Sequence, residues 1–195
     1  LSLTDTDSTA ITIASVNDAP SGTSATVSAT EDVPYVFSRS DFGFSDVDGD
    51  AFQRVWITTL PGQGSLLYNG VTFPANNWID AGDLDLGLLT FEAAPDASGT
   101  AYASFTFQVQ DDGGTANGGV NKDPTPDTLT IDVAAANDAP TISSLSGDSA
   151  SYAGGDGAVV IEQGGDALVA DVDSADFDTG TLTVSFVAGS DSSED

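Results

Sequence analysis

The sequence predicts an all-β protein whose central part folds as an antiparallel β-sandwich. Three observations support this prediction: apolar and polar residues alternate over short runs, Gly, Asp and Pro separate these runs, and a four-residue motif occurs twice. Alternation with a period of two is typical of strands that bury one face. Several short strands at regular spacing are typical of a sandwich. Helical periodicity is weak throughout, although Ile79–Leu89 could hold one helical turn.

The clearest predicted strand is Ala101–Gln110, where Ala103, Phe105, Phe107 and Val109 should face the core. Two further strands flank Asn69-Gly70, a dipeptide that favours the type I′ turn of a tight hairpin. These two strands are expected at 66–68 and 71–73, and the remaining strands at 26–29, 33–37, 55–60, 88–91 and 128–133. In the strand at 55–60, Val55 and Ile57 share one face and Trp56 lies on the other. We nevertheless expect Trp56 to pack in the core.

A repeated motif divides the chain. Asn17-Asp18-Ala19-Pro20 recurs as Asn137-Asp138-Ala139-Pro140, and each copy follows an alternating run. Because Pro cannot donate to a strand ladder, each copy should end a strand and act as a linker. We therefore expect residues 1–16 to be the last strands of a preceding repeat, 17–136 to be one complete sandwich, and 137–195 to begin another. Within the last part, strands are expected at 158–161 and 181–187.

Composition excludes several classes of function. The 195 residues carry a net charge of −28 with three Lys and Arg, and they include no His or Cys. Disulfides, thiolate nucleophiles, structural zinc sites and Ser-His-Asp triads are therefore excluded. Three cations are too few for a surface that tracks nucleic-acid phosphates. No apolar run approaches the ~18 residues of a membrane span. We expect an extracellular or cell-surface protein that is not an enzyme.

The carboxylates are concentrated at particular points. The chain has 27 Asp and four Glu, and Asp46-Val47-Asp48-Gly49-Asp50 is repeated in shorter form as Asp171-Val172-Asp173. Two unit charges about 4 Å apart near a protein surface repel by about 4 kcal/mol. A bound divalent cation would offset this repulsion, and calcium takes six to eight oxygen ligands. One such loop alone would more often be a solvated turn, but its recurrence after each linker favours a calcium site.

The order of these motifs resembles that of a known family. Thr30-Glu31-Asp32, the Asp46–Asp50 loop, Phe105–Gly113 and the second linker follow one another as in cadherin-type repeats. More narrowly, the sequence is similar to the tandem cadherin-like repeats of very large secreted bacterial surface proteins, including RTX-type adhesins. The resemblance covers residues 17–140 well, and the flanking residues as partial repeats. It implies a cadherin- or immunoglobulin-like sandwich.

The resemblance also implies how the ligands are grouped. One junction would use the linker, the Asp-x-Asp loop and the Asp after the long strand, and the next would use the equivalent residues together with Glu31. The implied ligands are Asn17, Asp18, Asp46, Asp48 and Asp111 at the first junction, Glu31, Asn137, Asp138, Asp171 and Asp173 at the second, and Glu162 at a third. Asp50, the last carboxylate of the Asp46–Asp50 loop, is a further candidate ligand. Two family acids are absent, since Ser15 and Ala135 occupy their positions. Of a further family motif only Asp96 remains, so fewer ions, or different ones, are expected at each junction.

These features predict a calcium-stiffened stalk repeat of an adhesin or surface filament, which mediates surface or biofilm adhesion. Its partners would be neighbouring repeats of the same chain or identical chains, with glycan or host surfaces bound by distal domains. One alternative is a calcium-dependent carbohydrate-binding module that uses Trp78 in the polar stretch Asn76-Asn77-Trp78. Another is a filament subunit in which residues 1–16 complete residues 141–195 of a second chain. An enzyme with paired carboxylates is the weakest alternative, because the sequence marks no substrate cleft.

Overall fold

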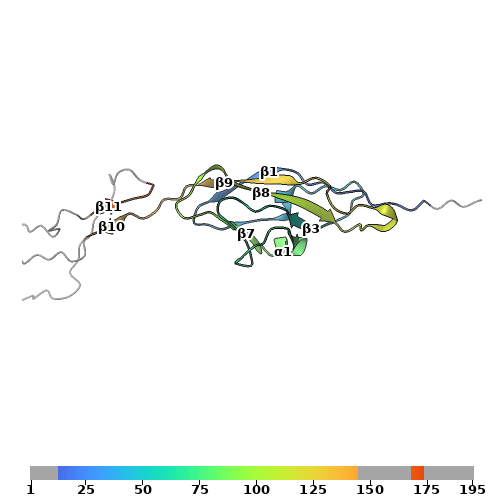
Figure 1. Ribbon diagram of the computed structural model, residues 1–195, viewed down its shortest axis with the longest axis horizontal. Coiled ribbons are helices and arrows are strands. Elements are labelled where there is room, and N and C mark those ends of the chain that lie inside the picture. The colour runs from blue at the N-terminus through green and yellow to red at the C-terminus, as the bar shows by residue number, and fades with distance from the viewer. Residues whose placement is uncertain (1–12, 145–167, 174–195) are drawn as a thin grey trace, which may run out of the picture. The chain divides into compact units, whose positions relative to one another are not determined.

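The computed structural model describes residues 13–144 and 168–173 (Figure 1). The chain divides into two compact units, Leu1–Ala135 and Ala136–Asp195, and each is described by itself. The three-part division expected from the repeated motif stays a prediction. Residues 1–12, which hold most of the expected preceding strands, lie outside the described residues, and residues 13–16 are not in a strand.

The first unit is a β-sandwich, which confirms the predicted all-β fold. A five-stranded sheet has the order β1-β9-β8-β3-β6, and a four-stranded sheet has the order β2-β7-β4-β5. In Figure 1, β1, β8 and β9 lie together on one side of this unit and β7 lies on the other. The strands are β1 (Ala25–Thr30), β2 (Tyr35–Val36), β3 (Phe52–Ile57), β4 (Ser65–Tyr68), β5 (Val71–Thr72), β6 (Asn77–Asp80), β7 (Leu89–Glu92), β8 (Gly99–Asp111) and β9 (Asp127–Ala134).

Aromatic side chains from both sheets fill the core. Phe105 of β8 meets Phe37 edge to face, with ring centroids 5.6 Å apart, and Phe107 meets Phe42 at 5.0 Å. Edge-to-face pairs of this kind add stability beyond the area they bury. As predicted, the alternate residues Ala103, Phe105, Phe107 and Val109 are all buried. The core therefore rests on the strand that the sequence identifies most clearly.

Local turn chemistry also follows the sequence. Asn69 and Gly70 both have positive φ, 50° and 76°, as a type I′ hairpin between β4 and β5 requires. The single turn expected within 79–89 is α1 (Ala81–Asp85), and short 3₁₀ segments occur at Arg39–Phe42 and Ala116–Gly118. None of the helices in the described residues is long enough to cross a bilayer.

In the five-stranded sheet, one strand is not predicted from the sequence and one side chain is predicted wrongly. Strand β6 was not expected, because only Ile79 of its four residues is buried and the segment before it is polar. Trp56 is not in the core: it is half-buried on the outer face of β3, while Val55 and Ile57 face inward. On this outer face Trp56 is partly covered by its cross-strand neighbour Trp78, and the centroids of the two rings are 4.7 Å apart.

The strand directions place the acidic motifs at opposite ends of the sandwich. Strands β1 and β9 run parallel, with Ala25 opposite Leu129 and Thr30 opposite Ala134. The linker before β1 and the end of β8 therefore lie at one end, where the Asp46–Asp50 loop also enters β3. Glu31 follows β1 at the other end, and its backbone N–H donates to Ala134 O at 3.0 Å.

In the second unit the structure describes one strand pair, β10 (Thr141–Ser143) antiparallel to β11 (Leu168–Ala170). The strands expected at 158–161 and 181–187 lie outside the described residues. Residues 1–12, which form most of the segment expected to complete this part of a second chain, lie outside them as well. Strand β11 ends directly before Asp171, so the shorter Asp-x-Asp motif follows a strand.

Candidate metal centre

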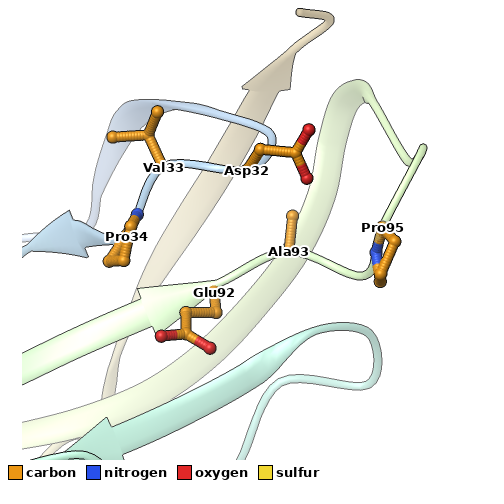
Figure 2. Close-up of a pocket in the computed structure, with 6 residues that line it drawn as sticks. All are labelled: Asp32, Val33, Pro34, Glu92, Ala93 and Pro95. Atoms are coloured by element: carbon orange, nitrogen blue, oxygen red, sulfur yellow. The ribbon is translucent and has the colours of Figure 1, made fainter. Parts of the chain in front are cut away.

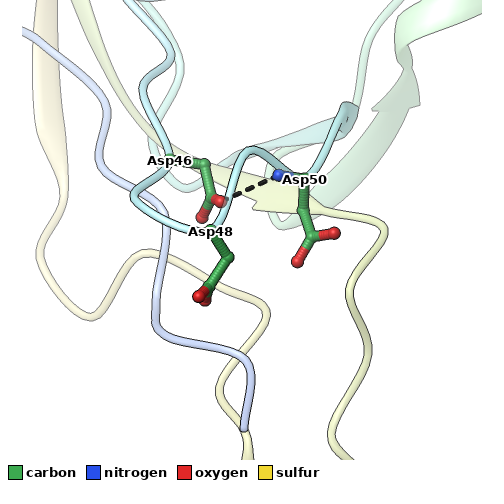
Figure 3. A group of neighbouring side chains, drawn as sticks. All are labelled: Asp46, Asp48 and Asp50. Atoms are coloured by element: carbon green, nitrogen blue, oxygen red, sulfur yellow. Dashed lines mark hydrogen bonds between the residues drawn. The ribbon is translucent and has the colours of Figure 1, made fainter. Parts of the chain in front are cut away.

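Three carboxylates converge in the loop that leads into β3. Asp46, Asp48 and Asp50 each offer an oxygen within 4.8 Å of the others (Figure 3). Two oxygens that both bind one calcium ion at about 2.4 Å can lie at most about 4.8 Å apart. The spacing of this cluster, called here the Asp triad, is therefore compatible with all three side chains binding one ion.

The loop sequence holds the triad in place. The backbone N–H of Asp50 donates to Asp46 Oδ1 at 2.9 Å, which closes the loop on its own first carboxylate (Figure 3). Between them Gly49 has a φ of 84°, a left-handed conformation that glycine adopts without strain. Just before the loop, Ser45 and Ser21 exchange backbone hydrogen bonds at 2.8 and 2.9 Å. This bridge fixes the loop beside the linker.

The linker contributes the next groups. The backbone N–H of Asp18 donates to Asp48 Oδ2 at 2.7 Å. Val120 N donates to Asn17 O at 2.9 Å, and Asn17 Nδ2 lies within hydrogen-bonding distance of both Asp111 carboxylate oxygens, at 3.2 and 3.3 Å. The linker motif, the Asp triad and the end of β8 therefore meet at one point. The family resemblance groups these segments at the first junction, and their binding of an ion stays a prediction.

Asp111 is fully buried at the end of β8. Burial raises the pKa of this carboxyl, while hydrogen bonds from Gly113 N and Asn17 lower it and the charges of Asp46 and Asp50 raise it. Asp46 and Asp50 therefore lie close enough to Asp111 for their negative charges to repel its carboxylate. In this structure Asp111 anchors the linker, and its role as a metal ligand stays a prediction.

Asp112 and Gly113 belong to the same site but were not among the predicted ligands. Asp112 Oδ1 accepts a hydrogen bond from Ala51 N at 2.7 Å, which ties the β8 end to the entry of β3. A Cβ on Gly113 would overlap with Asn17 Oδ1 and Asp50 Oδ2. Both oxygens therefore approach the same side of Gly113, at a position that a side chain would otherwise occupy. The run Asp111-Asp112-Gly113-Gly114 was visible in the sequence, but the close approach of residues 17, 50 and 113 was not.

Two oxygens at this site are buried without a hydrogen-bond partner among the described residues: Asn17 Oδ1 and Asp46 Oδ2. Leaving a buried acceptor unsatisfied costs about 1–3 kcal/mol. Both belong to residues predicted as ligands from the sequence. A cation bound between the linker and the triad would satisfy both oxygens.

No basic side chain neutralises this charge in the described part of the chain. The ion pair found there joins Arg39 to Asp85 on α1 and includes no residue of the triad. Desolvation raises the pKa of Asp50, and the negative charges of Asp46, Asp112 and Asp48 raise it further. The site is therefore rich in oxygens, carries excess negative charge and has buried acceptors to fill. These properties fit a hard divalent cation such as calcium.

The second repeat reproduces part of this arrangement within its own unit. Asp138 N donates to Asp173 Oδ2 at 3.2 Å, as Asp18 N does to Asp48 Oδ2. Asp173 N in turn donates to Asp171 Oδ1 at 3.2 Å, and the side-chain hydrogen bond with Asp171 raises the pKa of Asp173. Asn137 Nδ2 differs from Asn17 in donating to the neighbouring Asp138 O. The contact between linker and Asp-x-Asp motif thus occurs in both repeats.

Within the first unit, Glu31 is the predicted ligand that is not brought to the Asp triad. Glu31 is buried at the opposite end of the first unit, and Glu162 lies outside the described residues. Beside Glu31, a hollow of about 340 Å³ is lined by Asp32, Val33, Pro34, Glu92, Ala93 and Pro95 (Figure 2). The carboxylates of Asp32 and Glu92 do not converge on a common point in this view. The grouping of Glu31 with residues of the second unit stays a prediction.

A family model described as a bacterial Ig domain matches residues 17–123, which is more than half of the chain. The chain belongs to the bacterial Ig domain family. The match begins at the first residue of the linker motif and includes the Asp triad and Asp111. Searches of curated proteins and of solved structures returned no significant match.

Membership of the bacterial Ig domain family bears on several expectations. Bacterial Ig domains commonly occur in surface proteins and are typically not enzymes, which points to a structural module of the surface or adhesin type. The family match supports the Ig-like part of the predicted fold family and not specifically its cadherin-like part. The candidate metal centre at the linker end of this Ig domain is suggested by the geometry given above and stays a prediction.

Replacing Gly113 by Ala is expected to weaken calcium binding by about tenfold, because the new methyl group would separate Asn17 Oδ1 from Asp50 Oδ2. Isothermal titration calorimetry would measure the change. Gly82→Ala is the matched control, since a Cβ there meets no atom within 4 Å. Equal calcium affinity in the two variants would contradict an ion that is bound by both Asn17 Oδ1 and Asp50 Oδ2 beside Gly113.

Proposed function

We propose that the chain is a calcium-stiffened structural repeat of an extracellular bacterial surface protein, with one ion site at the linker end of each Ig domain. The observation that carries the proposal is the convergence of the Asp triad with the linker, where Asn17 Oδ1 and Asp46 Oδ2 are buried without a hydrogen-bond partner among the described residues. In this arrangement Asp46, Asp48 and Asp50 would hold the ion together with Asn17, and Asp18 and Asp111 would complete or orient this set.

The bound ion would supply positive charge and fix the geometry of the joint. The linker is held to the domain by hydrogen bonds from Asp18 N and Asn17 Nδ2. An ion that also draws on Asn17 would join the linker to the loop through its ligands, and repulsion within the triad would be relieved. Since extracellular modules bind calcium with Kd values of about 10⁻⁴–10⁻³ M, such sites would fill outside the cell.

Repetition of this joint would make a stiff stalk. The contact between linker and Asp-x-Asp motif recurs in the second repeat, which supports a joint that is used more than once. The partners would be the adjacent repeats, and adhesion to a glycan or host surface would fall to domains elsewhere. This is the way cadherin-like repeats of bacterial adhesins are expected to work, so the finer family assignment is part of the proposal.

Stiffening can be tested by electron paramagnetic resonance, because the chain has no Cys and accepts spin labels at chosen sites. Labels at Ser65→Cys and Ser143→Cys would span the second linker. Calcium is expected to narrow their distance distribution, whereas a pair at Ser65→Cys and Thr115→Cys within the first unit should not change. A distribution across the linker that stays equally broad with and without calcium would contradict the proposal.

Acidification is expected to shrink the stabilisation that calcium gives. Burial raises the pKa of Asp50 and Asp111 above the ordinary value of 3.8. In the metal-free protein the folded state therefore holds more protons, so its stability rises as the pH falls through these raised pKa values. Calcium needs the ionised carboxylates, so protons compete with it. Thermal melts with and without calcium, between about pH 7 and pH 4, would measure how far calcium raises the melting temperature at each pH. If this increase does not become smaller at low pH, the carboxylates are not the calcium ligands.

A further inference from the structure

A second hollow, of about 450 Å³, opens between the free edges of the two sheets. Strand β6 is the last strand of one sheet and β5 the last strand of the other, and α1 lies beside them. This volume is within the ~300–1,000 Å³ typical of small-molecule sites. The residues that matter for its chemistry are Arg54, Tyr68, Asn77, Trp78, Asp80 and Asp83.

Trp78 is held rigidly at this hollow. Its ring meets Trp56 at 4.7 Å with an interplanar angle of 68°, and the guanidinium carbon of Arg54 lies 4.2 Å from its centroid. A cation over an indole and an aromatic neighbour both fix the ring. A preorganised ring loses little entropy when a ligand packs against it. Trp78 lines the hollow and Trp56 does not, although both belong to the same aromatic pair.

Polar groups of both kinds surround the aromatic residue. Asp80 precedes α1 at the N-cap position but makes no side-chain capping bond, so its carboxylate can accept from a ligand. Tyr68 donates to Asp83 Oδ2 at 2.9 Å, and this bond raises the pKa of Tyr68 and keeps its hydroxyl protonated. Arg54 donates through Nε to Gln110 Oε1 at 3.0 Å, and among the described residues its two terminal nitrogens have no hydrogen-bond partner.

These features select a class of ligand. A sugar ring has apolar C–H faces that pack on aromatic rings, and hydroxyl groups that both donate to carboxylates and accept from guanidinium or amide N–H groups. With a net charge of −28, the protein repels anionic ligands, while a neutral one meets no such penalty. The combination of one fixed Trp, two carboxylates and one Arg fits a neutral sugar better than an acidic one.

We propose that this hollow binds a neutral saccharide, which packs on Trp78, donates hydroxyl hydrogen bonds to Asp80 and Asp83, and accepts one from Arg54. The site is separate from the metal centre and shares none of its residues. A stalk repeat with such a site would contact surface polysaccharide along its length.

A glycan array of neutral, sialylated and sulfated saccharides, probed with the full chain in EDTA, tests the proposal without involving the metal centre. The neutral glycan with the strongest signal would then be titrated by tryptophan fluorescence. The chain holds two Trp residues, so Trp56→Phe leaves Trp78 as the only emitter. We expect neutral glycans to bind and this variant to keep both its affinity and a Trp78 fluorescence change.

Trp78→Ala and, separately, Asp80→Asn are expected to weaken binding at least tenfold. Asp96→Asn, an exposed Asp outside the hollow, is the charge-matched control and should bind normally. Melting curves identify any variant that fails to fold, and Asp80→Asn keeps the test valid if Trp78→Ala is unstable. An array without a bound neutral glycan, binding to acidic glycans alone, or affinity unchanged in Trp78→Ala and Asp80→Asn would each overturn the proposal.

Discussion

Calcium is expected to raise the melting temperature of the metal-free protein by roughly 5–10 °C. With a Kd of about 10⁻⁴ M and calcium at about 10 mM, binding to the folded state alone adds about 2.7 kcal/mol of stability. For a domain of this size each kcal/mol shifts the melting temperature by about 2–4 °C. The physical source of the gain is neutralisation of the Asp triad together with satisfaction of Asn17 Oδ1 and Asp46 Oδ2. Differential scanning calorimetry before and after EDTA treatment measures it.

Magnesium provides the control for this experiment. It demands near-octahedral geometry at about 2.0–2.1 Å and gives up its water reluctantly, so an equal concentration should stabilise the protein less than calcium does. Equal shifts with both ions would indicate general screening of the −28 charge instead of a specific site. Identical melting curves with calcium and with EDTA would contradict the metal centre.

The double substitution Asp46→Asn and Asp48→Asn is expected to weaken calcium binding at least 100-fold, equivalent to about 2.7 kcal/mol. Each Asn keeps an oxygen of similar position but removes a negative charge, and charge is what the triad offers a divalent cation. The same change should raise the melting temperature of the metal-free protein, because it removes repulsion within the triad. Opposite effects on calcium affinity and on metal-free stability are the signature of a binding site.

Asp83→Asn with Asp85→Asn is the matched control. These residues have the same Asp-x-Asp spacing and lose the same charge, but they lie on α1, where Asp85 pairs with Arg39 and Asp83 accepts from Tyr68. Titration calorimetry of this variant should give the wild-type calcium affinity. If both double variants bind calcium equally well, or equally poorly, the ion is not held by the triad.

The strands that could be predicted are those whose side chains alternate strongly. In β8 four alternate apolar residues are buried in the core. The turn at Asn69-Gly70 was also predictable, because it needs two residues with positive φ and this need is set by the turn itself. Strand β6 escaped prediction because an edge strand needs only one inward residue, here Ile79. Trp56 is expected in the core because its strand alternates cleanly, but this alternation turns Val55 and Ile57 inward and Trp56 outward. Trp78 and Lys122, whose Nζ lies 5.8 Å from the Trp56 ring centroid, partly cover it instead.

For the candidate site, the sequence could indicate ligand types and their local spacing. The Asp triad follows from five consecutive residues, and its loop closes on itself through Asp50 N and Asp46 Oδ1. The meeting of Asn17 with Asp111, 94 residues apart, came from the family resemblance, since chain spacing alone does not bring them together. The close approach of Asn17 and Asp50 to Gly113 depends on three segments at once, so no local pattern could reveal it.

The most direct test is a crystal structure of the chain grown in calcium, with the anomalous signal of the ion recorded. We expect a peak among Asp46, Asp48 and Asp50, within about 2.3–2.6 Å of their carboxylate oxygens and of Asn17 Oδ1. An anomalous map without a peak there, with the three carboxylates turned outward into solvent at saturating calcium, would contradict it.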